Sequence, residues 1–179
     1  MEYLLKNGKT VLLRPPVEAD AEAVIEILRR ADGETRFLAR NPGEFQITPE
    51  KERQMIARLN ADPDSSWFLP EYEGKVVGQC SVSLVRSRER YRHRASVAFV
   101  LLREYWGLGI GGKMMEECLR WCREKGVTQV ELDVVRENER AQRMYQGFGF
   151  KVVGVMPRAL RYPDGTYADE LIMVKLLKE

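Results

Sequence analysis

The chain has 179 residues, of which 29 are Lys or Arg and 27 are Asp or Glu, so its net charge is +2. This length fits one domain, residues 1–179, with a core of its own, and the near balance of charge provides no strong field to attract nucleic acid or an anionic membrane. The first residues lack the order of a signal peptide and no apolar run approaches the roughly 18 residues of a membrane helix, so we expect a cytoplasmic protein without nucleic-acid or membrane partners.

The first third of the chain predicts one strand and two helices. Residues 10–14 have the pattern of a strand, and residues 20–30 that of an amphipathic helix with Asp20 as its N-cap. A second helix is predicted from Thr48, its cap, to about residue 60. The polar stretch of about 17 residues between the two helices is either a substrate lid or an ordinary surface loop.

The rest of the chain predicts a meander of three strands, followed by helices and strands in alternation. In chain order we expect strands at 66–69, 75–85 and 95–102, a helix at 109–125, a strand at 130–135, a helix at 138–146, and strands at 150–155 and 168–176. The complete order predicts an α/β (α+β) fold with a mixed, mostly antiparallel central sheet of about six to seven strands and about four helices.

A glycine segment, Trp106-Gly-Leu-Gly-Ile-Gly-Gly-Lys113, precedes the helix at 109–125. Its spacing satisfies the dinucleotide fingerprint and nearly satisfies the P-loop. Met114 stands where a P-loop needs Ser or Thr, and the dinucleotide motif needs a parallel strand–helix–strand unit, whereas the preceding strands here look antiparallel. Both motifs share one physical feature, which is a set of N–H groups at a helix N-terminus that favours an anion. We therefore predict a pyrophosphate site.

A second motif places Asn138 and Tyr145 two helical turns apart, hence on nearly the same helix face, before Gly-Phe-Gly-Phe150. Together with Val97-Ala-Phe-Val-Leu-Leu, the glycine segment and Glu-Leu-Asp-Val, this motif resembles the GNAT superfamily of acyl-CoA-dependent N-acyltransferases. The Arg14-Pro-Pro start and the closing Asp-Gly-Thr-Tyr-Ala-Asp-Glu-Leu-Ile-Met resemble the branch that acetylates amino acids, polyamines and protein N-termini. The resemblance covers nearly the whole chain.

The resemblance implies acetyl-CoA as co-substrate, direct transfer to an amine, and no metal. Its pyrophosphate would lie on the backbone of the glycine segment, its pantetheine arm would pair with the third strand of the meander and contact Asn138, and its sulfur would lie beside Tyr145. The implied cofactor-binding residues are Phe99, Val100, Leu101, Leu102, Leu108, Gly109, Ile110, Gly111, Gly112, Lys113, Asn138 and Tyr145. Two positions depart from the family pattern: Trp106 replaces the usual Gln or Arg, and Ser96 replaces a carboxylate.

Tyr145 is the predicted catalytic residue, because a phenol with a pKa near 10 can donate a proton or a hydrogen bond to the leaving sulfur. An N-cap role for Asn138 is compatible with the resemblance. The base that accepts the amine proton stays open among Glu34, Glu44, Asp133 and Asp169. The missing carboxylate at Ser96 favours an α-amine, which is partly neutral near pH 7. By position, the acceptor site is expected near Phe37, Phe45, Tyr162, Tyr167 and Asp169.

Other features are weaker signals. Cys80, Cys118 and Cys122 are expected in the core as reduced thiols, since zinc would need four compatible ligands and only His93 could complete the set. The arginines at 86, 88, 90, 92 and 94 indicate a solvated hairpin tip or a contact for an acidic partner. The alternatives to an N-acetyltransferase are a non-catalytic acyl-CoA-sensing module and a nucleotide-dependent oxidoreductase. Homodimers are common among proteins of this appearance, and nothing in the sequence decides the oligomeric state.

Overall fold

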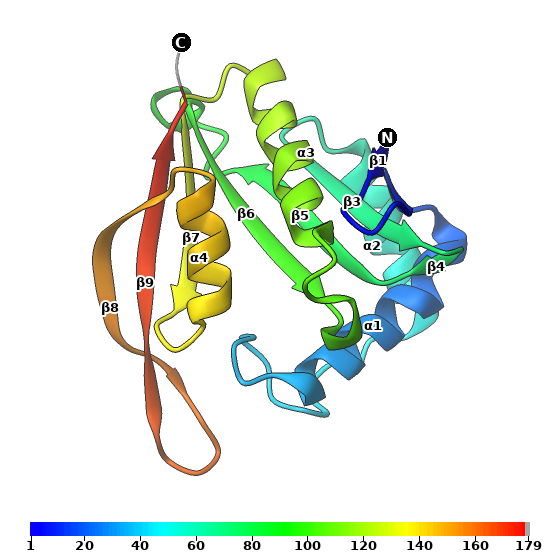
Figure 1. Cartoon of the computed structure of the whole chain (residues 1–179), viewed down its shortest axis with the longest axis horizontal. Helices are drawn as coiled ribbons and strands as arrows, with labels where there is room; N and C mark the ends of the chain where they lie inside the picture. The colour runs from blue at the N-terminus through cyan, green and yellow to red at the C-terminus, as the bar shows by residue number, and fades with distance from the viewer. Residues whose placement is uncertain (178–179) are drawn as a thin grey trace.

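The computed structural model describes residues 1–177, and their strands form one sheet in the order β1-β2-β3-β5-β6-β7-β9-β8, with β4 paired to β3 (Figure 1). The strands are β1 (Glu2–Leu4), β2 (Thr10–Arg14), β3 (Ser65–Tyr72), β4 (Lys75–Val76), β5 (Gly78–Leu84), β6 (Arg94–Leu101), β7 (Gln129–Val135), β8 (Lys151–Arg161) and β9 (Tyr167–Leu176). The helices are α1 (Ala21–Glu34), α2 (Pro49–Ala61), α3 (Ile110–Glu124) and α4 (Glu139–Gly147). Every strand pair is antiparallel except β6 with β7. The predicted mixed, mostly antiparallel fold class is therefore confirmed.

The predicted number of strands was too low, because the described residues contain nine. The short strand β1 carries no alternating pattern of its own and forms by pairing with β2. The segment predicted as one strand at 75–85 breaks at Val77, whose N–H donates to the Pro70 carbonyl, and so becomes β4 and β5. Strand β8 also continues beyond the predicted residue 155, through register shifts that bring Arg158 to a φ of +52°.

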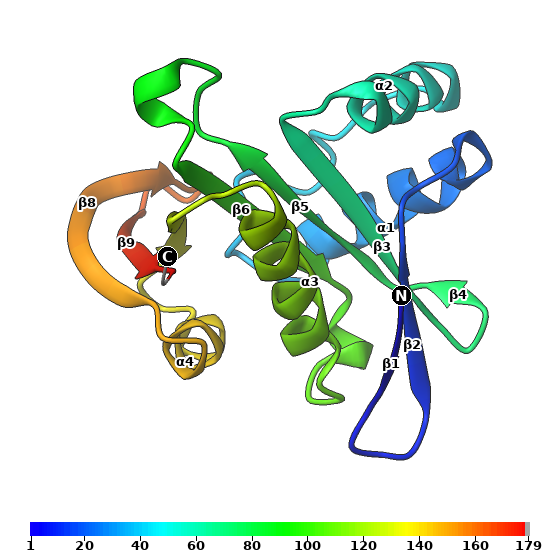
Figure 2. The same ribbon diagram turned by 90° about the horizontal axis from the view of Figure 1, so that it is seen from above.

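Helices cover both faces of the sheet: α1 and α2 lie on one side, and α3 and α4 lie on the other (Figure 2). On the first side, Val24, Leu28 and Ile56 pack against Trp67 and Leu69 of β3. On the second side, one face of α3 enters a larger core, with both its cysteines buried as their helical spacing predicted. Because both faces are covered, the central strands are buried on both sides, as β3 shows with four consecutive buried residues.

The helix ends follow the predicted caps with one exception. The hydroxyl of Thr48 accepts from the N–H of Lys51 at 3.3 Å, and Gly126, which follows α3, has a φ of +69°. Asp20 holds the N-cap position of α1 as predicted, but its side chain makes no capping hydrogen bond. Its carboxylate instead accepts the Val17 N–H at 2.7 Å and two bonds from Arg14. A short 3-10 turn at Glu18–Asp20 therefore leads into the helix.

The sheet opens between its two central parallel strands. β6 and β7 pair over only three residues each, Arg94–Ser96 with Gln129–Glu131, whereas β6 stays paired with β5 up to Leu101 and β7 with β9 up to Val135. Beyond the paired residues the two strands diverge (Figure 1). We call this opening, between residues 97–101 and residues 132–135, the wedge.

The arginine cluster singled out in the sequence lies where β5 connects to β6. The arginines at 86, 88, 90 and 92 occupy the β5–β6 connection, and Arg94 begins β6. Arg86 and Arg94 lie over the ring of Tyr91, and Arg92 pairs with Asp64. Within residues 1–177, no helix combines the length and the apolar character that crossing a bilayer requires.

Candidate active site

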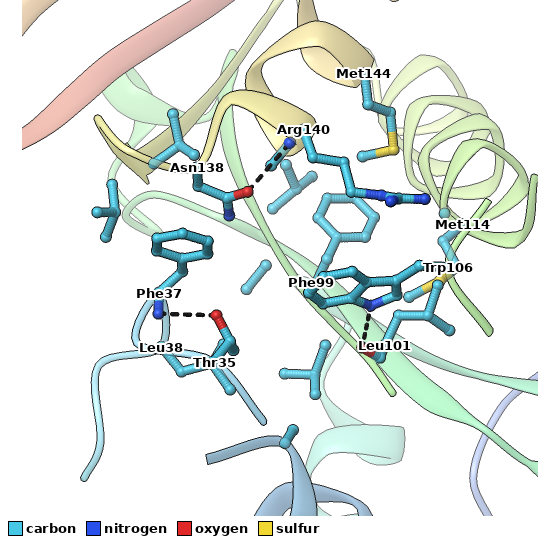
Figure 3. A pocket seen from close by; sticks show the side chains of 18 of the residues that line it. Thr35, Phe37, Leu38, Phe99, Leu101, Trp106, Met114, Asn138, Arg140 and Met144 are labelled. Atoms are coloured by element: carbon cyan, nitrogen blue, oxygen red, sulfur yellow. Dashed lines mark hydrogen bonds between the residues drawn. The ribbon is translucent and has the colours of Figure 1, made fainter. Parts of the chain in front are cut away.

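A cavity of about 710 Å³ lies at the wedge. Its walls come from residues of β5, β6, β7 and β9, from the end of α1 and the loop after it, and from the start of α3 and the first two turns of α4. Figure 3 shows Thr35, Phe37 and Leu38 of the loop on one side of the cavity, and Trp106, Arg140 and Met144 on the other. The cavity therefore joins the glycine segment to the loop between α1 and α2.

The glycine segment offers a row of unused backbone donors. The N–H groups of residues 107–112 meet no hydrogen-bond acceptor in the described part of the chain, and the first helical bond runs from Lys113 N–H to the Gly109 carbonyl at 3.3 Å. Gly107 and Gly109 have φ values of +85° and +92°, a left-handed conformation that L residues rarely adopt. N–H groups at a helix N-terminus beside left-handed glycines form an anion site, so the segment fits a pyrophosphate.

Side chains of the glycine segment mostly point away from the cavity. Ile110 is fully buried and Leu108 packs against the core. The ammonium group of Lys113 binds the Glu116 carboxylate at 2.9 Å, and its backbone N–H is already used by the helix. Lys113, one of the predicted cofactor-binding residues, therefore has neither its ammonium group nor its backbone N–H free for a ligand. The contribution of this segment to anion binding lies in its main chain.

Trp106 has two cationic neighbours. Its indole N–H donates to the Leu101 carbonyl at 2.7 Å, and the guanidinium groups of Arg103 and Arg140 lie 5.6 Å and 5.3 Å from its ring. A Cβ placed on Gly107 would lie 3.3 Å from the Arg140 guanidinium, so this charge stands directly at the glycine segment (Figure 3). Arg140 forms no ion pair within residues 1–177. Sequence reasoning missed this residue, although its position two residues after Asn138 was a usable signal.

The exposed edge of β6 is formed by alternate residues. Leu102 N–H donates to the Val77 carbonyl on the β5 side, and successive residues of a strand direct their N–H and C=O groups to opposite sides. The backbone groups of Val100 and Leu102 therefore face β5, and those of Phe99 and Leu101 face the wedge. Since Trp106 already occupies the Leu101 carbonyl, the Phe99 N–H and C=O and the Leu101 N–H remain for a ligand.

Helix α4 brings the two predicted polar residues to the cavity. The Oδ1 atom of Asn138 accepts the Ala141 N–H at 3.2 Å, so Asn138 is the N-cap and only its NH₂ group is left for a ligand (Figure 3). The Tyr145 ring is 8% exposed and packs against Phe99 and Phe150 at centroid distances of 6.1 Å and 6.0 Å. Burial raises the pKa of Tyr145 to about 12, so its hydroxyl keeps its proton at neutral pH.

Three of the four carboxylates considered as bases are engaged or distant. Glu34 reaches the cavity but accepts the Arg103 N–H at 2.7 Å. Glu44 is exposed and does not line the cavity. Asp169 accepts the Arg158 N–H at 2.9 Å and also lies outside the cavity lining. Their hydrogen bonds and positions leave Asp133 as the remaining candidate.

Asp133 lines the cavity, and its carboxylate has no hydrogen-bond or ion-pair partner among residues 1–177. Burial, and secondarily the charge of Glu131, raise the pKa of the Asp133 carboxyl. Glu170 also lines the cavity, and its pKa is raised by burial and by the charge of Asp133. A carboxylate with a raised pKa is a stronger base than an ordinary one, so Asp133 and Glu170 are the candidate proton acceptors of the cavity.

Of the aromatic residues expected around the acceptor, one lines the cavity and the others lie outside its lining. Phe37 lines the cavity. Phe45 packs against the core between α1 and α2, and Tyr167 is 49% exposed outside the cavity lining. The Tyr162 hydroxyl donates to the Arg36 carbonyl at 3.0 Å, which connects the β8–β9 hairpin to the loop after α1. Together with the ion pair between Arg36 and Asp164 at 3.2 Å, this bond fixes the start of the loop to the hairpin.

Comparisons with known proteins agree with this geometry. Residues 22–150 match the model of the acetyltransferase (GNAT) family. An uncharacterized N-acetyltransferase of Mycobacterium tuberculosis is 31% identical over 99 residues, and the match covers 55% of this chain and 61% of that protein, less than two thirds of its length. The L-amino acid N-acetyltransferase AaaT of Escherichia coli is 26% identical over 137 residues, 74% of this chain and 81% of that protein.

A solved structure extends the similarity over nearly the whole chain. The ribosomal-protein-alanine N-acetyltransferase from Brucella melitensis superposes with a TM-score of 0.81 at 26% identity, covering 93% of this chain and 99% of that one. The similarity in sequence and the similarity in fold thus indicate the same family.

Proposed function

Because this chain belongs to the acetyltransferase (GNAT) family, we propose that it is an N-acetyltransferase that moves an acetyl group from acetyl-CoA to a primary amine by direct transfer. The acceptor is a small molecule, such as an amino acid or polyamine, or a peptide N-terminus. The observation that carries the proposal is that one cavity joins the free N–H groups of residues 107–112 to the phenol of Tyr145. A cytoplasmic location and action as a single domain, residues 1–179, remain part of the proposal.

The phosphate end uses the main chain of the glycine segment. Gly109, Ile110, Gly111 and Gly112 offer their N–H groups to the pyrophosphate, in line with the charge preference of a helix N-terminus. The guanidinium of Arg140 supplies a side-chain cation that Trp106 cannot provide at its own position. Leu108 and Lys113 act here only as parts of the backbone turn.

The exposed edge of β6 holds the pantetheine arm. Phe99 offers one N–H and one C=O to the amides of the arm, and Leu101 offers its N–H, so the arm adds to the sheet as a short extra strand. Asn138 contributes its NH₂ group from the opposite side of the wedge. Val100 and Leu102 contribute by pairing with β5 and holding this edge in place.

Acetyl-CoA, when bound, supplies an acetyl group activated as a thioester. In the transfer a nitrogen–carbon bond forms, the carbon–sulfur bond breaks, and one proton passes in net from nitrogen to sulfur. Tyr145 donates a hydrogen bond to the leaving sulfur. Because its pKa of about 12 lies above the value near 8.5 that is typical of a thiol, complete proton transfer from the phenol is uphill, and we assign it the hydrogen-bonding role.

The proton on the amine side goes to Asp133, directly or through water. An α-amine with a pKa near 7.8 is partly neutral at pH 7, so the base has only a modest task for such acceptors. Asp133 is suited to it because it lines the cavity and keeps a raised pKa. Glu170 next to it holds the positive charge of the incoming amine.

Release of free thiol from acetyl-CoA, measured across amino acids, polyamines, aminoglycosides and short peptides, tests the proposal. Calorimetric titration with coenzyme A is run in parallel. We expect heat on titration and thiol release that depends on an amine. Binding without release on any amine would favour a sensing module, and the absence of binding would contradict the pyrophosphate site itself.

A further inference from the structure

The half of the cavity that faces away from the glycine segment has two unpaired carboxylates. We call it the acceptor half; it is walled by α1, the loop after it, and residues of β5, β7 and β9. Val135 of β7 is the register partner of Glu170 of β9, so Asp133, two residues earlier on the same face, is a diagonal neighbour of Glu170. Neither carboxylate has a hydrogen-bond or ion-pair partner in the described residues.

A third acceptor atom belongs to the lining of the same cavity. Gln79 of β5 lines the cavity, and its side-chain oxygen is buried without a hydrogen-bond partner. An unpaired buried carbonyl is costly unless a ligand supplies a donor. A protonated amine has three donors and no acceptor. The two carboxylates and the Gln79 oxygen therefore offer an ammonium group the kind of partners that it needs.

The acceptor half has no matching site for a negative group among residues 1–177. Two cationic side chains line the cavity, Arg40 and Arg140. Arg40 makes two hydrogen bonds, of 2.9 and 3.0 Å, to Asp32, whose side chain is 1% exposed, so its charge is already neutralised. Arg140 lies over Trp106 at the glycine segment. Among the described residues, the acceptor half thus offers acceptors for an ammonium group and no free cation for a carboxylate.

The remaining wall is apolar. Leu28 and Ala31 of α1 line it, as do Phe37 and Leu38 of the following loop. These side chains suit a hydrocarbon group attached near the amine, because burying it against them removes apolar surface from water.

Building on the proposed function, we infer that the acceptor is an apolar amine without a carboxylate on the carbon that bears its nitrogen, which favours a peptide N-terminus or an alkylamine over a free amino acid. A free amino acid would bring its carboxylate against Asp133 and Glu170 with no cation to offset the repulsion, and such juxtaposition of like charges is a strong means of rejection.

Three acceptors of similar shape test the inference: L-leucine, L-leucinamide and 3-methylbutylamine. The measurement is kcat/KM for thiol release from acetyl-CoA. We expect both carboxylate-free amines to exceed L-leucine at least ten-fold. The alkylamine is the control for basicity, because its amine is more basic than that of leucine and holds its proton more tightly, so a preference for it cannot come from easier deprotonation.

Variants then ask whether the two carboxylates cause the preference. Glu170→Gln and Asp133→Asn are each expected to lower the leucinamide-to-leucine ratio of kcat/KM at least three-fold, with the affinity for coenzyme A and the melting temperature unchanged. Glu44→Gln, which removes an exposed carboxylate outside the cavity, is the matched control and should keep the ratio.

The outcomes separate the two proposals. If thiol is released but either carboxylate-free amine exceeds leucine less than ten-fold, or if the ratio persists in both cavity variants, the inference is overturned and the proposed function stands. If none of the three amines releases thiol, the proposed function fails for its simplest acceptors and the inference fails with it.

Discussion

Replacing Tyr145 with Phe removes one hydroxyl and leaves the surrounding packing in place. The ring lies between Phe99 and Phe150, contacts that a phenylalanine keeps, and its hydroxyl has no hydrogen-bond partner among residues 1–177 that the change would orphan. A hydrogen bond to a group that carries charge contributes about 1.5–3 kcal/mol. At about 1.4 kcal/mol for each factor of ten, we expect kcat to fall roughly 10- to 150-fold.

The assay is thiol release under saturating acetyl-CoA, with calorimetry for coenzyme A and a thermal melt as controls for Tyr145→Phe. The affinity and the melting temperature should stay within error, and Tyr167→Phe, an exposed residue outside the cavity lining, should behave like the parent. Because the Tyr145 pKa is about 12, the phenol is protonated from pH 6 to 9 and adds no limb to the pH–rate profile there. An unchanged kcat, or a limb near pH 8 that disappears in the variant, would refute the reasoning.

Three other substitutions test separate parts of the structure. Arg140→Gln should raise the KM for acetyl-CoA about 5- to 30-fold with kcat kept, since it removes a charge-assisted contact to phosphate; Arg143→Gln, on the same helix but outside the cavity, is the control in the kinetic assay. Gly78→Ala should lower the free energy of unfolding in urea by about 1–3 kcal/mol and raise the same KM, because its Cβ would lie 2.3 Å from the Val100 carbonyl and displace β6. Asp20→Asn should cost about 1–3 kcal/mol at pH 7 by loss of its bonds to Arg14. Arg14 holds the pKa of Asp20 below its usual value near 3.9, so this stabilisation is present above that pH and is lost as the pH falls through the folded pKa, and the two melting temperatures should converge in acid.

The glycine turn before α3 and the Asn138 cap of α4 were predictable because their determinants are local in sequence. Left-handed glycines before a helix and an Asn cap depend on residues within a few positions of one another, and the structure has both. Errors arose where a local pattern competes with tertiary contacts. Asp20 has the residue type and position of a cap, yet Arg14 and the Val17 N–H take its carboxylate. Strand β1 has no pattern to detect, since it depends on β2 for its pairing.

The acceptor half was not predictable for a different reason, which is that its chemistry depends on which groups remain unpaired. Glu34, Asp133 and Asp169 are equivalent in the sequence as acidic residues near an expected site. Only the fold decides that a backbone N–H takes Glu34 and another takes Asp169, while Asp133 stays free. Its proximity to Glu170 depends further on the β7–β9 register, and a shift of one residue would move Glu170 to the other face of the sheet.

The same contrast suggests how the two halves tolerate change. In the proposed function, phosphate binding by main-chain N–H groups depends on glycine conformation. A side chain such as Trp106 can then replace the usual Gln or Arg provided that a cation reaches the segment from elsewhere, and Arg140 stands there. The acceptor half uses side chains from three strands, from α1 and from the loop after it, each replaceable without changing the backbone. Acceptor preference can therefore differ between chains that share the wedge and the glycine segment, because it depends on which charges of the acceptor half are unpaired and not on the fold.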